Sequence, residues 1–239
     1  MISVRVRRAW PGRSPMLLRV IVSLARACAA ALLGTACTFA LSCPAHAAKS
    51  LPLDQAVAAL PQAAESRDGY ERASFTYWNA GANPDDGCDT RDEVLIAEAV
   101  EPPATGPDCK LKGGTWSSYY DARQITSAAA MDVDHMVPLP EAWDSGASQW
   151  KASRREAYAN DLADPRTLVA VSAAAHRSKA DQDPAEWLPP NSKATCRYIV
   201  EWTAVKLRWS LTADTEERES LARLAEACPD ATVTYTPAP

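Results

Sequence analysis

The chain of 239 residues carries 25 Lys and Arg against 30 Asp and Glu, so its formal net charge at pH 7 is −5. A protein that grips nucleic acid over a wide surface needs clustered Lys and Arg, and this balance argues against a sequence-specific DNA-binding protein. It does not exclude an enzyme with one local basic pocket.

The first 47 residues have the pattern of a secretory signal peptide. The small-residue motif Ala45-His46-Ala47 follows an apolar stretch at residues 16–41. Basic residues precede that stretch, namely Arg5, Arg7, Arg8 and Arg13. Cleavage is expected after Ala47, which predicts secretion to the extracellular space or the periplasm. Residues 48–239 are expected to form a single domain, because about 190 residues can bury one sizeable core.

Other interpretations of this segment stay open. The apolar stretch could be a membrane-anchoring helix, although Arg19 and Arg26 inside it favour removal. Met16 could be the true start, and a lipoprotein anchor at Cys43 is weaker because the usual leucine three residues earlier is absent. Cleavage removes six arginines and no acid, so 25 basic and 30 acidic residues become 19 and 30 and the net charge becomes −11. We expect no stable membrane association after cleavage.

The first half of the mature chain predicts short elements. Residues 53–64 suit a short helix that Pro61 kinks or ends. Residues 93–99 suit a short helix or strand, and Gly113-Gly114 predicts a hairpin. The candidate core aromatics here are Tyr70, Phe75, Tyr77 and Trp78.

Four cysteines remain after cleavage, an even number that predicts two disulfides in an exported chain. Cys88 and Cys109 flank one short segment, and this proximity makes them the natural first pair. A structural zinc site is the alternative, but the sequence has no C-x-x-C pair.

The middle of the chain predicts two strands and then a helix. Residues 130–137 read as a strand that Pro138 closes, and residues 166–171 read as a second strand. A helix is expected between them at residues 149–159. Ser172 can cap a helix over SAAAHRSKADQ, and Asp183-Pro184 predicts a further helical piece.

The C-terminal part predicts a pair of helices at residues 191–228. Asn191 or Ser192 can cap the first helix, which runs to about Trp209, and Asp214 or Thr215 can cap the second. Cys196 then lies in the first turn of one helix and Cys228 in the last turn of the next. These ends are neighbours in an antiparallel pair, so we expect a Cys196–Cys228 disulfide.

The β-β-α unit could bring Asp134, His135 and His176 together. A carboxylate and an imidazole suit a divalent cation, and a second imidazole can accept a proton near pH 7. Phosphodiester hydrolysis needs both a cation and a general base. The alternative for Asp134 and His135 is that the strand pleat points one to solvent and the other into the core.

Two long segments carry a family resemblance, DVDHMVPLPEAWDSGASQW and YANDLADPRTLVAVSAAAHRSKADQDPAEWLPP. They resemble the HNH, or His-Me finger, nucleases, and more narrowly the secreted relatives of the C-terminal nuclease domain of GmrSD restriction enzymes. GCDTRDEVL and CRYIVEWTAVKLRW also fit, so the likeness runs from about Tyr70 to Trp209. It implies an α+β fold with a ββα-metal (HNH) core at about residues 131–190, embedded in a mainly helical domain with two disulfides.

The resemblance implies a role for each matching residue. His135 falls at the position of the general base, Asp134 at the first metal ligand and His176 at the last one. The metal would be one divalent ion, Mg²⁺ first, with Mn²⁺ or Zn²⁺ as alternatives. The alternative for His176 is an ordinary helix histidine. Asp132 is expected to support the site from the same strand face.

Thr167 departs from the family pattern. It falls where the family has an asparagine that orients the loop carrying the base, and a hydroxyl cannot both donate and accept as an amide does. A loss of rate, a shifted orienting role or inactivity could follow.

Three basic residues are candidates for phosphate contacts. Arg91 could reach the scissile phosphate, or it could pair with a nearby acid such as Asp92. Arg177 and Lys179 flank His176 and could bind substrate, or they could be solvated helix charges. The tryptophans favour core positions over base stacking, namely Trp143, Trp150 and Trp187.

The expected function is an exported, metal-dependent HNH endonuclease that hydrolyses DNA, and RNA as a further substrate, with little sequence preference. The activity should fall below about pH 6 if His135 is the base. One alternative is a secreted, disulfide-stabilised binding module that keeps the scaffold without activity. Another is a metal-dependent phosphodiesterase acting on a non-nucleic polymer. The sequence indicates no protein partner.

Overall fold

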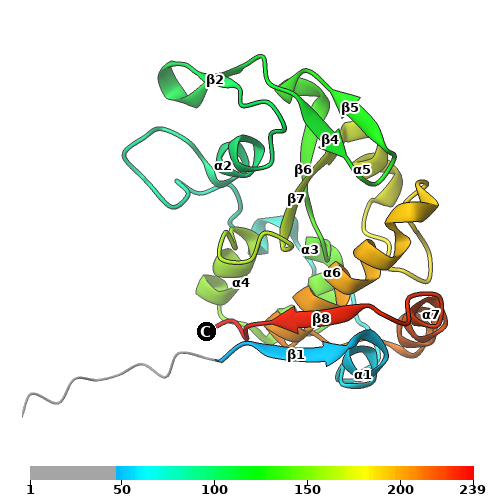
Figure 1. Ribbon diagram of the computed structural model, residues 1–239. Coiled ribbons are helices and arrows are strands. Elements are labelled where there is room, and N and C mark those ends of the chain that lie inside the picture. The colour runs from blue at the N-terminus through cyan, green and yellow to red at the C-terminus, as the bar shows by residue number, and fades with distance from the viewer. Residues whose placement is uncertain (1–46) are drawn as a thin grey trace, which may run out of the picture. The chain divides into compact units, whose positions relative to one another are not determined.

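The computed structural model describes residues 47–239, and the signal peptide expected at residues 1–47 lies almost wholly outside them. The described residues form a mixture of helices and short strands in one compact unit. Figure 1 shows the elements in chain order. The strands are β1 Lys49–Pro52, β2 Ala104–Thr105, β3 Leu111–Lys112, β4 Trp116–Ser118, β5 Arg123–Ile125, β6 Met131–His135, β7 Leu168–Ser172 and β8 Thr232–Tyr235. The α-helices are α1 Leu53–Ala58, α2 Thr90–Ala97, α3 Leu139–Asp144, α4 Ala152–Ala159, α5 Ala173–Lys179, α6 Thr195–Trp209 and α7 Thr215–Ala225.

The central sheet consists of β6 and β7, which pair antiparallel from Met131↔Ser172 to His135↔Leu168. Helix α5 follows β7 directly and packs on both strands. The Ser172 hydroxyl caps this helix by accepting a hydrogen bond from the Ala175 amide at 3.0 Å. The two strands and the helix therefore form the β-β-α unit that the sequence predicts.

Each face of this sheet packs against its own apolar cluster. Val133 and Leu168 belong to a small cluster with Val94 of α2 and Trp116 of β4. Val169 and Val171 point the other way, into the main core around helix α6. The side-chain period of two puts Asp132 and Asp134 on the face of Val169, and His135 on the opposite face.

Helix α6 runs through the main core, and most of its residues are buried. Trp143 and Trp187 are buried in this core and Trp150 packs against it, which confirms that these tryptophans have core positions. Asp214 caps α7 through the Glu217 amide at 2.8 Å, as predicted. The predicted cap of the long C-terminal helix is wrong, since α6 begins after a short 3₁₀ turn with no side-chain cap.

Both disulfides form as predicted. Cys88 and Cys109 have their Cα atoms 4.9 Å apart. Cys196 and Cys228 join α6 to the end of α7 with a Cα separation of 5.8 Å.

Two local features differ from the sequence predictions, and one long-range pairing is not predicted by the sequence. Gly113-Gly114 does not close a hairpin, because β3 pairs with β2 and β4 pairs with β5. The segment after Asp183 makes only a turn. Strand β1 pairs with β8 near the C-terminus, a long-range pairing with no local signal (Figure 1).

Within residues 47–239, no helix combines the length and apolarity needed to cross a membrane.

Candidate active site

A cavity of about 340 Å³ opens where strand β6 ends and helix α5 packs beside it. We call it the histidine pocket. Its polar lining residues are Arg72, Asp134, His135, His176, Arg177 and Asp181. Pro138, Leu139 and Pro140 form an apolar wall. The fold therefore brings the three residues singled out in the β-β-α unit to one cavity, although the pleat sends Asp134 and His135 to opposite faces.

Asp134 is almost completely buried, with 1% of its surface exposed. Its Oδ2 atom accepts hydrogen bonds from the Tyr120 hydroxyl at 2.7 Å and from the Lys179 ammonium at 2.6 Å. Its Oδ1 atom lies 3.5 Å from Nε2 of His176. One carboxylate oxygen is thus held by the protein, and the other is left facing the helical histidine.

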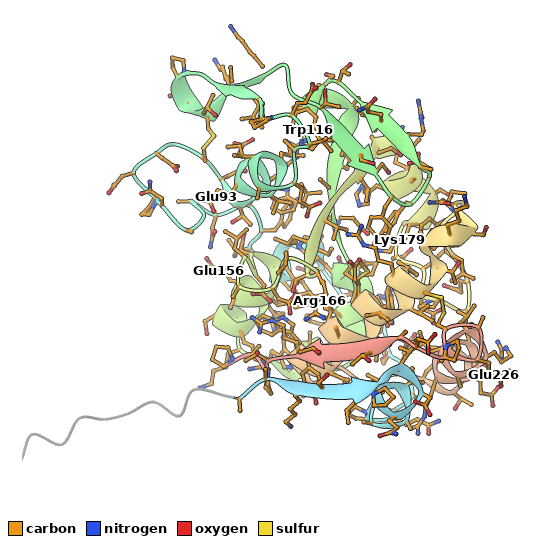
Figure 2. The ribbon with its side chains drawn as sticks, in the orientation of Figure 1. Glu93, Trp116, Glu156, Arg166, Lys179 and Glu226 are labelled. Atoms are coloured by element: carbon orange, nitrogen blue, oxygen red, sulfur yellow. A yellow bond between two sulfur atoms is a disulfide. The ribbon has the colours of Figure 1, made fainter. Side chains whose placement is uncertain are left out.

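The buried position of Lys179 does not suit the substrate contact that the sequence suggested. Its side chain is fully buried and points from α5 toward β6, where its ammonium also donates to the carbonyls of His135 and Met136 at 3.0 Å each (Figure 2). Burial lowers the pKa of Lys179, and the charge of Asp134 opposes that shift. Lys179 follows His176 by three residues, so the helical period puts both on the side of α5 that packs against the sheet. Its role is to fix Asp134 and the end of β6.

His176 is oriented by Asp132. Its Nδ1 atom lies 2.9 Å from Oδ2 of Asp132, and both side chains are about one-third exposed. A carboxylate can only accept, so Nδ1 carries a proton, and in the neutral ring Nε2 is the nitrogen that can bind a cation. Such carboxylate–histidine pairs commonly orient metal-ligating imidazoles. The neighbouring Oδ1 and Nε2 atoms are a donor set that suits a divalent cation.

The surroundings of His135 favour the neutral form of its ring. Its Nε2 atom lies 2.9 Å from the Ala159 carbonyl, which can only accept a hydrogen bond. Nδ1 is therefore the nitrogen left without a proton. The ring stacks on Trp78 at a centroid distance of 5.3 Å and lies 6.2 Å from the Tyr158 ring. Burial lowers the pKa of His135 to about 4, against the raising effects of the Ala159 carbonyl and Asp134. The imidazole is thus neutral across the physiological range.

Thr167 supports the loop behind His135 and does not touch the pocket. Its hydroxyl donates to Oδ2 of Asp161 at 3.0 Å, and its carbonyl accepts from the Met136 amide at 2.9 Å. Asp161 is in turn bound by Arg208 and Trp209 of α6. This geometry suits an orienting residue that acts through the backbone following His135.

Arg91 lies away from the histidine pocket. Its guanidinium donates to the carbonyl of Met131 at 2.9 Å, at the opposite end of β6 from His135. It lines a different cavity beside Asp92 and Cys109. The sequence prediction of a catalytic role for Arg91 is therefore not supported, because a strand of five residues separates it from the pocket by roughly 13 Å. Arg177 is exposed and lines the histidine pocket, as a substrate-binding residue must.

Two residues near His135 carry no signal in the local sequence. Arg72 lines the pocket from a 3₁₀ turn at Arg72–Ser74, and its charge contributes to the lowered pKa of His135. Asn160 follows the carbonyl that holds His135, and it binds the segment on both sides of Trp78. Its side-chain amide donates to the Thr76 carbonyl at 2.8 Å and accepts from the Asn79 amide at 3.0 Å. Both act across more than sixty residues of chain, and no local pattern signals such contacts.

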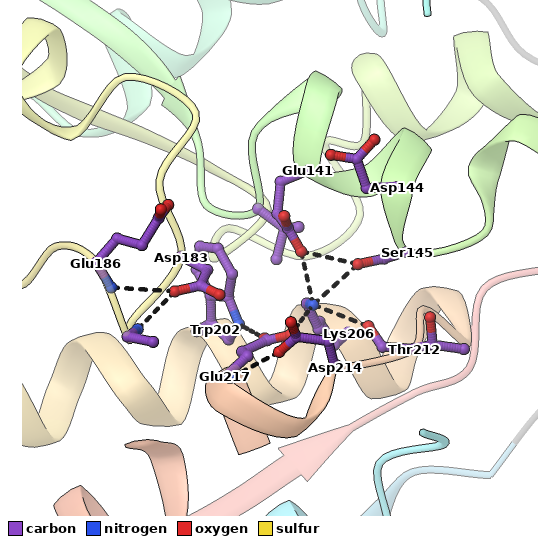
Figure 3. Close-up of polar contacts among 12 residues, drawn as sticks. Glu141, Asp144, Ser145, Asp183, Glu186, Trp202, Lys206, Thr212, Asp214 and Glu217 are labelled. Carbon is purple, nitrogen blue, oxygen red and sulfur yellow. Dashed lines mark hydrogen bonds and ion pairs between the residues drawn. The ribbon is translucent and has the colours of Figure 1, made fainter. Parts of the chain in front are cut away.

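A second cavity, which we call the acidic pocket, adjoins the histidine pocket and shares Asp181 with it. Its acidic lining residues are Glu65, Glu141, Asp181, Asp183, Glu186, Asp214 and Glu216. Beneath it the buried Lys206 ammonium pairs with Glu141 at 2.8 Å and with Glu217 (Figure 3). Burial, together with Glu141, raises the pKa of Glu65 to about 8. Glu141 is thus the partner of a buried lysine.

Comparison with known proteins gives two matches. Residues 106–224 match the family described as GmrSD restriction endonucleases, C-terminal domain. That segment includes Asp134, His135 and His176, whereas Arg72 precedes it. The chain is also 36% identical over 162 residues to a protein of Arthroderma benhamiae named "Uncharacterized secreted protein", a match covering 68% of this chain and 77% of that protein. No solved structure matches the chain.

Proposed function

Because the chain belongs to the family of GmrSD restriction endonuclease C-terminal domains, we propose that it is a metal-dependent endonuclease of the HNH, or His-Me finger, type. Its reaction is the hydrolysis of phosphodiester bonds in DNA, with RNA as a further substrate. The observation that carries the proposal is the meeting of three groups at one pocket. Oδ1 of Asp134 faces Nε2 of His176 at 3.5 Å, and His135 lines the same cavity with its Nδ1 unprotonated.

The donor set fits one divalent ion, Mg²⁺ first, with Mn²⁺ or Zn²⁺ as alternatives. Asp134 and His176 would hold it, and Asp132 would keep the His176 ring in place. A bound divalent ion would stabilise negative charge that develops on the phosphate and on the leaving oxygen. Water would complete its coordination, as is usual for Mg²⁺.

The protein's own residues would perform the remaining chemistry. His135 accepts a proton at Nδ1 from a water molecule as that water attacks phosphorus. The bond from phosphorus to the leaving oxygen breaks, and the leaving oxygen takes a proton from solvent. The Ala159 carbonyl keeps the ring in the required tautomer and stabilises the imidazolium that forms. Arg177 and Arg72 line the same pocket, and their guanidinium groups match the oxygens of a phosphate. Pro138, Leu139 and Pro140 form the apolar side of the same pocket.

Export is part of the same proposal. The pattern of residues 1–47, the two disulfides and the secreted relative all support it. A secreted nuclease has no evident need to read base edges, so we propose low sequence specificity.

Plasmid digestion tests the proposal. The oxidised mature protein should nick supercoiled DNA with Mg²⁺ or Mn²⁺, stop when a chelator is added, and lose activity in His135→Ala. The control is Asp230→Asn, since this exposed loop residue lies in none of the pockets near the site. Retention of DNA without cleavage would instead favour the binding module. Cleavage of bis(p-nitrophenyl) phosphate without cleavage of plasmid would favour a phosphodiesterase for another polymer.

A further inference from the structure

Two cavities of opposite charge adjoin the histidine pocket. The acidic pocket, of about 590 Å³, shares Asp181 with it. Another cavity, of about 520 Å³, lies between the β4–β5 hairpin and the start of α5 and shares Arg177 with it. We call this second neighbour the hairpin pocket. The two shared residues mark two directions in which a polymer can leave the histidine pocket, past Asp181 or past Arg177.

The hairpin pocket offers positive charge and polar groups. Arg123 stands on β5 opposite Ser118, and both Arg123 and Arg177 are exposed. Among residues 47–239, neither of these arginines forms an ion pair. Their charges are therefore open to a ligand. The remaining lining includes the hydrogen-bonding side chains of Gln124, Thr126 and Ser127, and it includes no carboxylate. Asp121 contacts the lining, where it accepts a hydrogen bond from the Ser172 hydroxyl at 2.6 Å.

The acidic pocket offers negative charge instead. The basic side chains in it and beneath it already pair with carboxylates. Arg67 pairs with Asp144 at 2.6 Å and with Asp181 at 2.8 Å. Lys206 is buried between Glu141 and Glu217 (Figure 3). Glu186 and Glu216 remain exposed on the lining. A phosphate placed here would meet like charge well within the Debye length of about 8 Å at physiological salt.

We infer that a nucleic-acid strand leaves the histidine pocket on one side only, over Arg177 into the hairpin pocket, and that this pocket binds the next phosphates of the strand. The inference rests on the proposed function and adds the direction of the substrate. It makes the preferred substrate a polynucleotide extended on one side of the scissile phosphate. It also explains how a chain of net charge −11 after cleavage binds a polyanion, since the favourable charge is confined to one path.

The test uses chromogenic esters whose released nitrophenol reports one defined bond. Two thymidine mononucleotide p-nitrophenyl esters, one on the 3′ phosphate and one on the 5′ phosphate, are compared with the corresponding trinucleotide esters. The trinucleotides extend on opposite sides of the scissile phosphate. With Mg²⁺ present, extension on one side should raise kcat/KM about fivefold or more, and extension on the other side should not.

Variants assign the gain to the two pockets. In Arg123→Ala the favoured extension should no longer raise kcat/KM. The slope of log KM against log salt should fall by about one, because one phosphate contact is lost. Arg123→Lys, which keeps the charge, should retain most of the gain. Arg223→Ala, which removes an exposed arginine on α7, is the matched control and should keep it. Neutralising the acidic pocket with Glu186→Gln and Glu216→Gln together should narrow the difference between the two extensions.

Hydrolysis of the mononucleotide esters separates the two proposals. If they are hydrolysed and both extensions give equal gains, or Arg123→Ala keeps the full gain, the one-sided path is wrong and the proposed function stands. If no ester and no plasmid is cleaved with any divalent ion, the proposed function itself is wrong.

Discussion

The Nδ1 atom of His176 lies 2.9 Å from Oδ2 of Asp132, and this contact turns Nε2 of the same ring toward Asp134, 3.5 Å away. Asp132 and Asp134 share one face of β6 because side chains alternate along a strand. Helix α5 packs across that face and brings His176 between the two carboxylates. One acid therefore orients the ring, while the other shares the proposed ligand site with it.

Replacing Asp132 by asparagine should weaken the metal response. The variant keeps the size of the side chain but removes the negative charge that holds the Nδ1 proton. We expect the metal concentration for half-maximal cleavage to rise about 10- to 100-fold. A titration of nicking rate against Mn²⁺ measures it, with Asp230→Asn as the control. An unchanged half-saturating concentration would show that Asp132 does not orient a ligand.

The loss of activity that follows protonation of His135 should occur at an unusually low pH. Burial lowers the pKa of this imidazole to about 4, so the base form dominates at pH 5 and above. We expect kcat/KM on a mononucleotide ester to stay flat from pH 8 to pH 5 and to fall below that, because protonated His135 cannot accept a proton. The sequence alone predicts that activity falls below about pH 6, and the burial of His135 moves the expected fall to lower pH.

The matching variant is His135→Ala, which should lower kcat by about 10²- to 10⁴-fold and remove the acidic limb of the profile. An acidic limb centred near pH 6.5 in the wild-type protein would mean that His135 is far more hydrated than its contacts with Trp78 and Tyr158 imply.

Lys179→Met should act on stability first. The substitution leaves the buried Asp134 carboxylate without its cation and leaves the carbonyls of His135 and Met136 without their donor. Breaking one side of a buried pair costs about 3–5 kcal/mol. Urea unfolding should show a loss of that order in the free energy of unfolding. Arg177→Met, two residues away and exposed, should change it by less than about 0.5 kcal/mol. Equal effects of the two variants would contradict the buried role of Lys179.

Glu98 should make the fold less stable at alkaline pH. This half-buried carboxyl follows α2, and its Oε2 atom accepts a hydrogen bond from the Ala170 amide of β7 at 3.0 Å. Burial raises its pKa from 4.5 to about 7. The folded state thus holds a proton that the unfolded state releases, and stability contributed by this group declines as pH rises from about 4.5 through 7.

Glu98→Gln removes the ionisation and keeps an acceptor for the Ala170 amide. Its melting temperature relative to the wild type should therefore rise as the pH is taken from 5 to 8, as differential scanning calorimetry can measure. Glu219→Gln, at an exposed position of α7, should show no such trend. A difference that is constant with pH would mean that Glu98 is ionised throughout.

Local sequence was enough for the parts of this protein that depend on near neighbours. The order strand, strand, helix follows from the β-branched runs and from the Ser172 cap, and it brought Asp134 and His176 together as predicted. The Cys196–Cys228 disulfide could be predicted because the ends of two consecutive antiparallel helices are neighbours. Sequence spacing also placed Asp132 on the correct face of its strand.

Only the tertiary structure decided what each charged group does. Lys179 and Arg177 look alike in the sequence, yet α5 turns one into the core and leaves the other at the pocket. Arg72 and the Ala159 carbonyl reach His135 from segments far along the chain, and Arg91 is carried to the opposite end of β6. The residue type determines the charge of a side chain. Its solvent exposure and its partners depend on packing between distant segments, which local periodicity does not predict.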